Sequence, residues 1–168
     1  MMHRVRHQIT LFLPEAASRL VEPIRAVVDP VQATLIRAHV TLVRDDELPQ
    51  ISPKMFTERL GQPIDWTSPL ELTFGGPLPS VDHGILMHCT SELTEFQSLR
   101  CRLFRELLSK SMNAHITLAH PRNPKAAGNT PQNLRPLANG LTIKFRQLAM
   151  IQQTDGQPWV TLKTVDLF

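Results

Sequence analysis

The sequence predicts an α+β fold with antiparallel sheets, built as a single domain over residues 1–168. Strand-like and helix-like segments follow one another in the order β-α-β-α-β-β-α-β-α-β-β, and two pairs of neighbouring strands have the connections of hairpins. Hairpins favour antiparallel sheets over the parallel sheet that the alternation alone would also allow. No segment has the composition of a linker, and the length fits one compact domain with a real core.

The first 43 residues predict a strand, a helix and a second strand. Residues 5–14 alternate apolar and polar side chains and contain β-formers, so we expect a strand there. The following segment, 15–30, has helical character, and Pro23 should break or kink it. The second strand is expected over residues 36–43.

A short helix is expected over residues 52–61 because both of its ends carry the usual signals. Ser52 is a suitable N-cap, and Pro53 suits the first helical position. Gly61 stands just past the last helical residue, where a left-handed conformation often ends a helix.

The middle of the chain predicts two strands and the clearest helix. Residues 70–74 and 83–89 are strand-like and are joined by a loop rich in glycine and proline, which predicts the first hairpin. Residues 91–110 carry apolar side chains at helical spacing. These are Leu93, Phe96, Leu99, Leu103 and Leu107.

The last third predicts a strand, a capped helix and a terminal hairpin. The strand is expected over residues 113–119, and the helix over 130–140, where Thr130 precedes a proline and Asn-Gly ends the segment. Residues 141–153 and 158–167 are both strand-like, and the turn sequence TDGQ separates them.

Composition indicates an ordinary soluble protein rather than a membrane protein, a disulfide-rich protein or one with a basic nucleic-acid-binding tail. Apolar residues make up 42% and charged residues 20%, and no apolar run is long enough to cross a bilayer. The apolar stretch near the start is too short for a signal peptide, so we expect a cytoplasmic monomer without membrane association. Cys89 and Cys101 are expected to be buried thiols, and no cysteine or histidine spacing predicts a metal site. The net charge of +3 is compatible with a polyanionic ligand.

One four-residue pattern occurs twice, once in each half of the chain. It reads HVTL from His39 and HITL from His115. Side chains two residues apart share one face of a strand, so each histidine shares a face with its threonine, Thr41 or Thr117. The apolar residues between them then point into the core. One copy would most often be a strand with an exposed histidine, whereas two copies indicate a site made of two matching halves.

Two histidines and two threonines around one point suit a phosphodiester or a cyclic phosphate. Histidine takes or gives a proton near neutral pH, so His39 and His115 can act as base and acid. The hydroxyls of Thr41 and Thr117 can donate hydrogen bonds to the non-bridging oxygens as charge builds on them. This scheme needs no metal and no other cofactor.

The two H-x-T-x motifs resemble those of the 2H phosphoesterase superfamily, which includes the RNA 2′,3′-cyclic phosphodiesterases, also called 2′-5′ RNA ligases. The likeness of layout covers most of the chain. It implies a bilobed α+β structure with two antiparallel-sheet lobes, pseudo-twofold symmetry, outer helices and a central cleft. It also implies that His39 and His115 are catalytic and that Thr41 and Thr117 bind phosphate. The implied reaction opens a 2′,3′-cyclic phosphate on RNA ends or nucleotides to a 2′-phosphate, or joins RNA ends reversibly through a 2′-5′ bond.

Several further residues are candidate substrate contacts. Arg44 follows the first motif, and His120 and Arg122 follow the second, where either a phosphate contact or a solvated position at the rim fits equally. Phe12 lies on the opening strand, which in the resembled family borders the cleft, so it is our choice for stacking on a base. The aromatic residues that could stack on a base are Phe12, Phe74, Trp66 and Trp159.

Three alternatives stay open on the sequence. The substrate could be another small cyclic or 2′-5′ phosphodiester. The chain could be an RNA-binding module with little turnover, although binding alone does not require two proton-transfer groups. The repeat could also be structural, in which case the two histidines would be buried or far apart.

Overall fold

The computed structural model describes residues 4–48, 66–104 and 111–167, together with positions 54, 58, 61 and 62. The helix expected over residues 52–61 falls largely outside these ranges, as does Leu107. The elements in chain order are β1 (Val5–Phe12), α1 (Glu15–Val28), α2 (Pro30–Leu35), β2 (His39–Val43), β3 (Leu70–Phe74), β4 (Leu78–Pro79), β5 (Ile85–His88), α4 (Thr94–Leu103), β6 (His115–Ala119), α5 (Pro131–Leu134), the 3-10 turn η1 (Arg135–Leu137), β7 (Leu141–Phe145), β8 (Gln147–Thr154) and β9 (Val160–Asp166).

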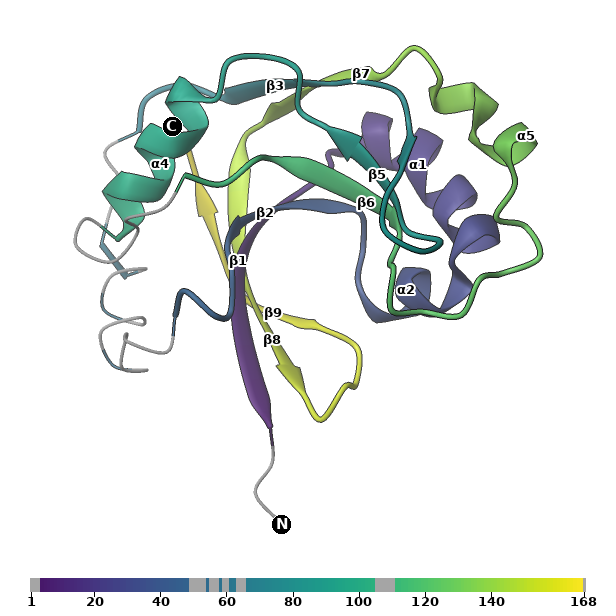
Figure 1. Ribbon diagram of the computed structural model, residues 1–168. Helices are drawn as coiled ribbons and strands as arrows, with labels where there is room; N and C mark the ends of the chain where they lie inside the picture. Colours follow the sequence, from purple (N-terminus) through teal and green to yellow (C-terminus); the bar gives the residue numbers. More distant parts are fainter. Residues whose placement is uncertain are drawn as a thin grey trace.

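Seven strands form one sheet in the order β4-β5-β6-β2-β1-β8-β9, and β3 and β7 form a second sheet (Figure 1). Every strand pairing among the described residues is antiparallel, which confirms the α+β class. The two strands that carry the repeated motif, β2 and β6, are neighbours at the centre of the large sheet. The bilobed arrangement with pseudo-twofold symmetry stays a prediction.

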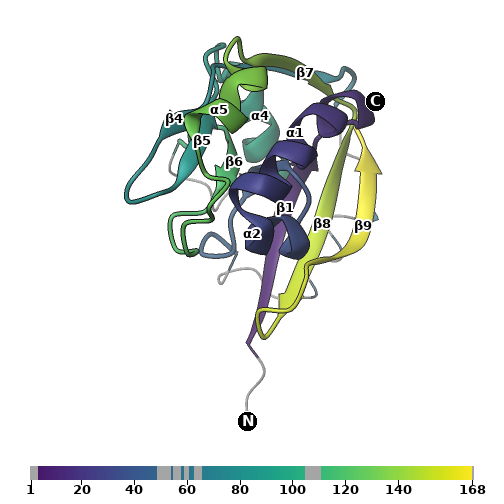
Figure 2. The same ribbon diagram turned by 90° about the vertical axis from the view of Figure 1, so that its right-hand side faces the viewer.

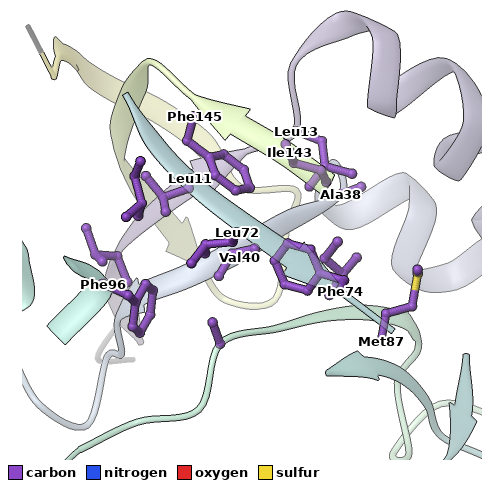
Figure 3. Packing of buried hydrophobic residues seen from close by; sticks show 14 of the residues in the cluster. Leu11, Leu13, Ala38, Val40, Leu72, Phe74, Met87, Phe96, Ile143 and Phe145 are labelled. Atoms are coloured by element: carbon purple, nitrogen blue, oxygen red, sulfur yellow. The ribbon is translucent and has the colours of Figure 1, made fainter. Parts of the chain in front are cut away.

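The hydrophobic core lies between the large sheet and the two-stranded sheet. Figure 3 shows Leu72 and Phe74 of β3 and Phe145 of β7 facing Leu11 and Val40 of the large sheet. All five side chains are almost inaccessible to solvent. Because this core covers one face of β1 and β2, the polar residues that alternate with the core residues are left for the opposite face.

The helices α1 and α4 also contribute buried residues to this core. Figure 2 shows α1 and α2 running together along one side of the molecule, and α1 packs against both α2 and β6. The helix α4 packs against β2 on the other side in Figure 1. No helix in the described part of the chain is long and apolar enough to span a bilayer.

The first predicted hairpin is wrong. β3 pairs with β7, while β5 pairs with β4 and β6, so the two expected strands belong to different sheets and meet each other at one isolated antiparallel bridge, between Phe74 and Cys89. The segment 141–153 is likewise two strands, because β7 joins the small sheet and β8 the large one. The terminal hairpin of β8 and β9 is confirmed, and Asp155 and Gly156 at its turn have φ angles of 50° and 75°. Two consecutive left-handed residues match the twist of a hairpin.

Two smaller expectations also need correction. The helix α1 continues through Pro23 to Val28, because burial of its apolar face outweighs the one backbone hydrogen bond that proline removes. The chain then ends α1 at Asp29, whose side chain accepts a hydrogen bond from the amide of Gln32 and starts α2 as a separate helix. Both cysteines are free, but neither is buried as expected: Cys89 is half-buried and Cys101 is exposed.

Candidate active site

The two motifs lie side by side in the large sheet and present the same pattern of burial. β2 and β6 pair antiparallel through Val40 and Ile116, both of which are fully buried. His39 and Thr41 on β2 are partly buried on the opposite face, and the equivalent residues of β6 repeat this arrangement. His39, Thr41, His115 and Thr117 all line one cavity of about 360 Å³. The alternation expected from the sequence therefore brings the four side chains to one place.

Both motif histidines are oriented by the same backbone contact. Nδ1 of His39 lies 2.7 Å from the carbonyl oxygen of Arg37, and Nδ1 of His115 lies 3.2 Å from that of Asn113. A carbonyl oxygen can only accept, so each Nδ1 carries a proton and donates it. In the neutral form each Nε2 is then unprotonated and can accept a proton. The two rings are held in the tautomer that a general base requires.

Burial makes both histidines weaker bases than free histidine. Desolvation lowers the pKa of His39 to about 4, and the hydrogen bond to Arg37 only partly opposes this effect. Desolvation also lowers the pKa of His115, and the nearby charge of His88 adds to the lowering. The ring of His88 lies 6.3 Å from that of His115. Both motif histidines are therefore neutral at pH 7 in the free protein.

The hydroxyl of Thr41 is also prepared by a neighbour. Nε2 of Gln8, a residue of β1 that is only 8% exposed, donates a hydrogen bond of 2.9 Å to Oγ1 of Thr41. Because this bond occupies an acceptor position of the oxygen, the hydroxyl proton of Thr41 is available for a ligand. Gln8 therefore directs the donor of Thr41 into the cavity.

A buried arginine of α1 fixes the chain just before His39. The guanidinium of Arg25, 1% exposed, donates to the carbonyl of Ile36 at 2.9 Å and to Glu22 at 2.7 Å. Glu22 in turn accepts a hydrogen bond from the amide of Ala38. The ion pair of Arg25 and Glu22 therefore holds the backbone that leads into β2 at two points, the carbonyl of Ile36 and the amide of Ala38.

A second buried arginine fixes the other end of the same strand. Arg100 of α4, also 1% exposed, donates to the carbonyl of Leu42 and pairs with Glu47 at 2.6 Å. Leu42 directly follows Thr41. His39 and Thr41 thus lie between two arginine–glutamate pairs whose arginines come from different helices, α1 and α4.

The loop after β6 is held by the buried carboxylate of Asp29. This side chain is 2% exposed and accepts hydrogen bonds from the amide of His120 at 2.8 Å and from the side-chain amide of Asn123 at 3.0 Å. It also caps α2 through the amide of Gln32. One carboxylate therefore joins the start of α2 to the end of the second motif strand.

Comparison of sequences finds no match, whereas comparison of structures does. No model of a known family and no curated protein matches the chain. LigT of E. coli, solved in complex with 3′-AMP, superposes with a TM-score of 0.63 over 97% of this chain and 98% of its own, at 16% identity. The chain has the fold of LigT. TT0787 of Thermus thermophilus superposes with a TM-score of 0.59 over 96% and 97% of the two chains at 20% identity. A protein described as a phosphoesterase gives 0.58 over 98% and 99% at 14% identity.

Of the further residues predicted for the site, two line the cavity and two do not. His120 and Arg122 are among its lining residues. Arg44 pairs with Asp46 on the exposed surface instead, so the structure places it outside the cavity lining. Phe12 lies edge-on to the ring of His39, with 6.3 Å between the ring centres, but lines a separate groove of about 980 Å³ beside α1, β8 and β9. The roles of these four residues remain predictions.

Sequence reasoning missed several residues that the LigT fold brings to the cavity. Arg6 and Gln8 share a face of β1 with Phe12, so strict alternation along this strand would have found them. Trp159 was one of four candidate aromatic residues, and it lines the cavity, whereas Phe12 does not. The others come from parts of the chain that no local pattern connects to the motifs. They are Gln32, Leu35, Ile36, Asn123 and Gln153.

No group of three or more histidine, cysteine, aspartate or glutamate side chains among the described residues is arranged to hold a metal ion. A reaction without metal or cofactor stays a prediction that an assay has to test.

Proposed function

We propose that this protein is a 2H phosphoesterase that opens 2′,3′-cyclic phosphates to 2′-phosphates by acid and base catalysis with two histidines. One observation carries the proposal: both histidine–threonine pairs line one cavity, and both imidazoles have Nδ1 on a backbone carbonyl and Nε2 free to exchange a proton. A purely structural repeat would leave the histidines buried in the core or far apart, which is not the arrangement found. LigT, which shares the fold, has been solved with phosphate, 3′-AMP, NADP⁺ and ATP.

The reacting phosphate is held by the two threonines. Thr41 and Thr117 donate to the two non-bridging oxygens, and the bond from Gln8 keeps the Thr41 donor directed at the ligand. The backbone of β2 cannot shift away from the developing charge because Arg25 and Arg100 fix it at both ends. The site is therefore organised before the substrate arrives, so that little reorganisation is needed in the transition state.

His39 acts as the general base and His115 as the general acid. The pKa of His39 is lowered to about 4, so its Nε2 is unprotonated at neutral pH and takes a proton from the attacking water. Desolvation also lowers the pKa of His115, but a bound anionic phosphate favours its protonated form. Protonated His115 gives its Nε2 proton to the departing 3′ oxygen.

The reaction balances with water as the only co-reactant. The water oxygen bonds to phosphorus as the bond between phosphorus and O3′ breaks, which leaves the phosphate on O2′ and a free 3′ hydroxyl. His39 releases the proton it took to solvent, and His115 takes one up. A 5′ hydroxyl in place of water would form a 2′-5′ bond by the same steps, which is the ligation reaction that the resemblance implies.

The reaction is tested by ³¹P NMR of a short RNA that ends in a 2′,3′-cyclic phosphate, incubated with chelator-treated protein. We expect a 2′-phosphate product. A 3′-phosphate product would contradict the assignment of the leaving oxygen. No turnover of this RNA, together with cleavage of a 2′-5′ linked dinucleotide, would favour the alternative of a different phosphodiester substrate. Tight RNA binding without cleavage of either would favour the RNA-binding module.

A further inference from the structure

We propose that Arg6, His120 and Arg122 form a second anion site in the catalytic cavity, which binds a second phosphate group of the substrate. This inference rests on the proposed function, because it concerns the same cavity. It adds a preference that the motifs do not contain: the cyclic phosphate should be attached to a nucleotide with another phosphate rather than to a bare nucleoside.

The three side chains come from opposite walls of the cavity. Arg6 is on β1, next to β8, whereas His120 and Arg122 follow β6 and are tied to α2 through Asp29. Figure 1 shows the β8–β9 hairpin beside the lower part of β1, and α2 beyond the hairpin on the same side. The three residues nevertheless line one cavity, and the charges of Arg6 and Arg122 both act on the ring of His120. They converge on one region.

Arg6 is held rigidly with one edge left for a ligand. Its Nε donates to Asp45 at 2.7 Å, its Nη1 donates to Gln153 at 3.1 Å, and its guanidinium lies over the ring of Trp159 at 5.3 Å. Nη2 has no hydrogen-bond partner among the described residues. A guanidinium fixed on three sides loses little freedom when it binds a phosphate oxygen, which favours this residue as an anchor.

His120 is oriented in the opposite way to the catalytic histidines. Its Nδ1 accepts a hydrogen bond of 3.1 Å from the amide of Arg122. In the neutral ring the proton is therefore on Nε2, so that His120 offers a donor where His39 and His115 offer an acceptor. A donor histidine beside two arginines suits an anion and does not suit a third proton acceptor.

The positive charge of the two arginines is not balanced by any acidic residue in the described lining of the cavity. The described residues that line it include two arginines and three histidines but no aspartate or glutamate. Asp29 and Asp45 stand behind the lining and are engaged by His120 and Arg6, respectively. The guanidinium of Arg122 is exposed and has no side-chain partner in the part of the chain described. A polyanionic substrate would supply the missing negative charge.

The position of this cluster requires a ligand larger than one phosphate. His120 is three residues beyond Thr117, or about 10 Å along an extended chain. Arg6 is four residues from Thr10, the partner of Thr41 in the sheet, or about 13 Å along β1. Because these residues lie beyond the threonines along both strands and line the same cavity, a nucleotide with a second phosphate can reach both places.

Binding of products tests the site without relying on turnover. We would measure, by calorimetry, the Kd of adenosine 2′-phosphate, adenosine 2′,5′-bisphosphate and the dinucleotide ApA with a terminal 2′-phosphate. The two larger ligands distinguish a 5′-phosphate from an internucleotide phosphate. We expect at least one of them to bind roughly tenfold to hundredfold more tightly than the monophosphate, the effect of one or two charge-assisted hydrogen bonds.

Variants then identify the residues. Arg122→Gln should remove most of this preference, because it should weaken the binding of adenosine 2′-phosphate much less than that of the larger ligands. Lys125→Gln removes the same charge from the same loop but outside the cavity lining, so it should keep the preference. Arg6→Gln should act like Arg122→Gln. Equal affinity for the three ligands, or equal weakening of all three by Arg122→Gln, would overturn the inference.

The same variants separate this inference from the proposed function. Wild-type protein that binds the bisphosphate through Arg122 but does not open any cyclic phosphate would leave the anion site standing and refute the reaction. The opposite result is turnover of adenosine 2′,3′-cyclic phosphate at a rate that does not change when a 5′-phosphate or a nucleotide is added to the substrate. That result would support the reaction and refute the anion site.

Discussion

At the residue scale, the proposed reaction depends on two imidazoles that belong to nearly identical motifs but lie in different surroundings. Both are oriented by a carbonyl two residues earlier in the chain, a contact that the extended backbone provides directly. Desolvation lowers the pKa of His39 to about 4, and it lowers the pKa of His115 as well. In the proposed reaction His39 serves as the base, and His115 serves as the acid once a bound anionic phosphate favours its protonated form.

The pH dependence of kcat/KM reports the two histidines in the free protein. His39 must be neutral, so activity should fall on the acid side near pH 4. His115 must be protonated, and its lowered pKa places the alkaline fall below pH 6.5. The optimum should therefore lie on the acid side of pH 6.5, measured with a cyclic nucleotide that does not titrate in this range. A rate that keeps rising between pH 6.5 and 8 would contradict the assignment of the acid.

This profile needs a stability control because the same shift affects folding. His39 binds a proton more readily in the unfolded chain, where its pKa is about 6.5, than in the folded protein. Its contribution to the free energy of unfolding is therefore complete above pH 6.5 and is lost as the pH falls toward 4. Circular dichroism at each pH separates loss of fold from loss of activity.

The threonines predict a graded series of rates. Thr41→Ala and Thr117→Ala should each lower kcat by up to roughly 10²–10³-fold, because each removes one donor to the developing charge. Thr41→Ser keeps the hydroxyl and should retain most of the activity. Gln8→Leu should have a smaller effect than Thr41→Ala, because it removes only the group that orients the hydroxyl. A Gln8 variant that is as slow as Thr41→Ala would contradict this order.

At the element scale, the strand β2 is the part of the fold on which the site depends most. Arg25 of α1 and Arg100 of α4 reach its two ends from different sides, and each brings a glutamate. Buried pairs of this kind are expensive to desolvate, so their value here lies in fixing the backbone between them rather than in net stability. The motif strand is positioned by helices that the motif itself does not predict.

Arg25→Met tests this arrangement against a matched change on the same helix. Loss of Arg25 leaves Glu22 and the carbonyl of Ile36 without their partner, so the free energy of unfolding should fall by about 3 kcal/mol. Arg19 is exposed and, within the described part of the chain, pairs with Glu15 alone, so Arg19→Met should cost about 0.5 kcal/mol or less. Urea unfolding monitored by circular dichroism measures both. Equal effects of the two substitutions would refute the role of Arg25.

At the scale of the whole molecule, two copies of one short motif from the two halves of the chain meet at the centre of one sheet. The meeting depends on β2 and β6 being neighbours, with β1 and β5 on their outer sides. Phe12 of β1 stands opposite His39, and His88 of β5 stands opposite His115 in the same register. The residues that flank each motif histidine thus occupy matching places but differ in chemistry.

The sequence predicted what depends on local pattern and missed what depends on pairing. The tetrad was found because alternation along a strand places His39 with Thr41 and His115 with Thr117 without any knowledge of the sheet. The partner of β3 was not found, because nothing in residues 70–74 indicates pairing with a strand some 70 residues later.

The rest of the cavity shows the same limit of local reasoning. Long-range contacts with backbone groups are made by Arg25, Arg100 and Asp29. Every residue has the same backbone groups, so the sequence does not indicate which of them such a side chain will contact. Trp159 reaches the cavity only because the β8–β9 hairpin folds back toward α2, where its amide bonds the carbonyl of Leu35. Each of these contacts requires the complete topology.

The most direct test of the central claim compares wild-type protein with His39→Ala and His115→Ala in opening a 2′,3′-cyclic phosphate on a short RNA, after treatment with a chelator. We predict that wild type converts the RNA end to a 2′-phosphate, whereas both variants remain folded and lose turnover. Unchanged activity in either variant, or loss of wild-type activity with the chelator and its return with added metal, would contradict catalysis by two histidines alone.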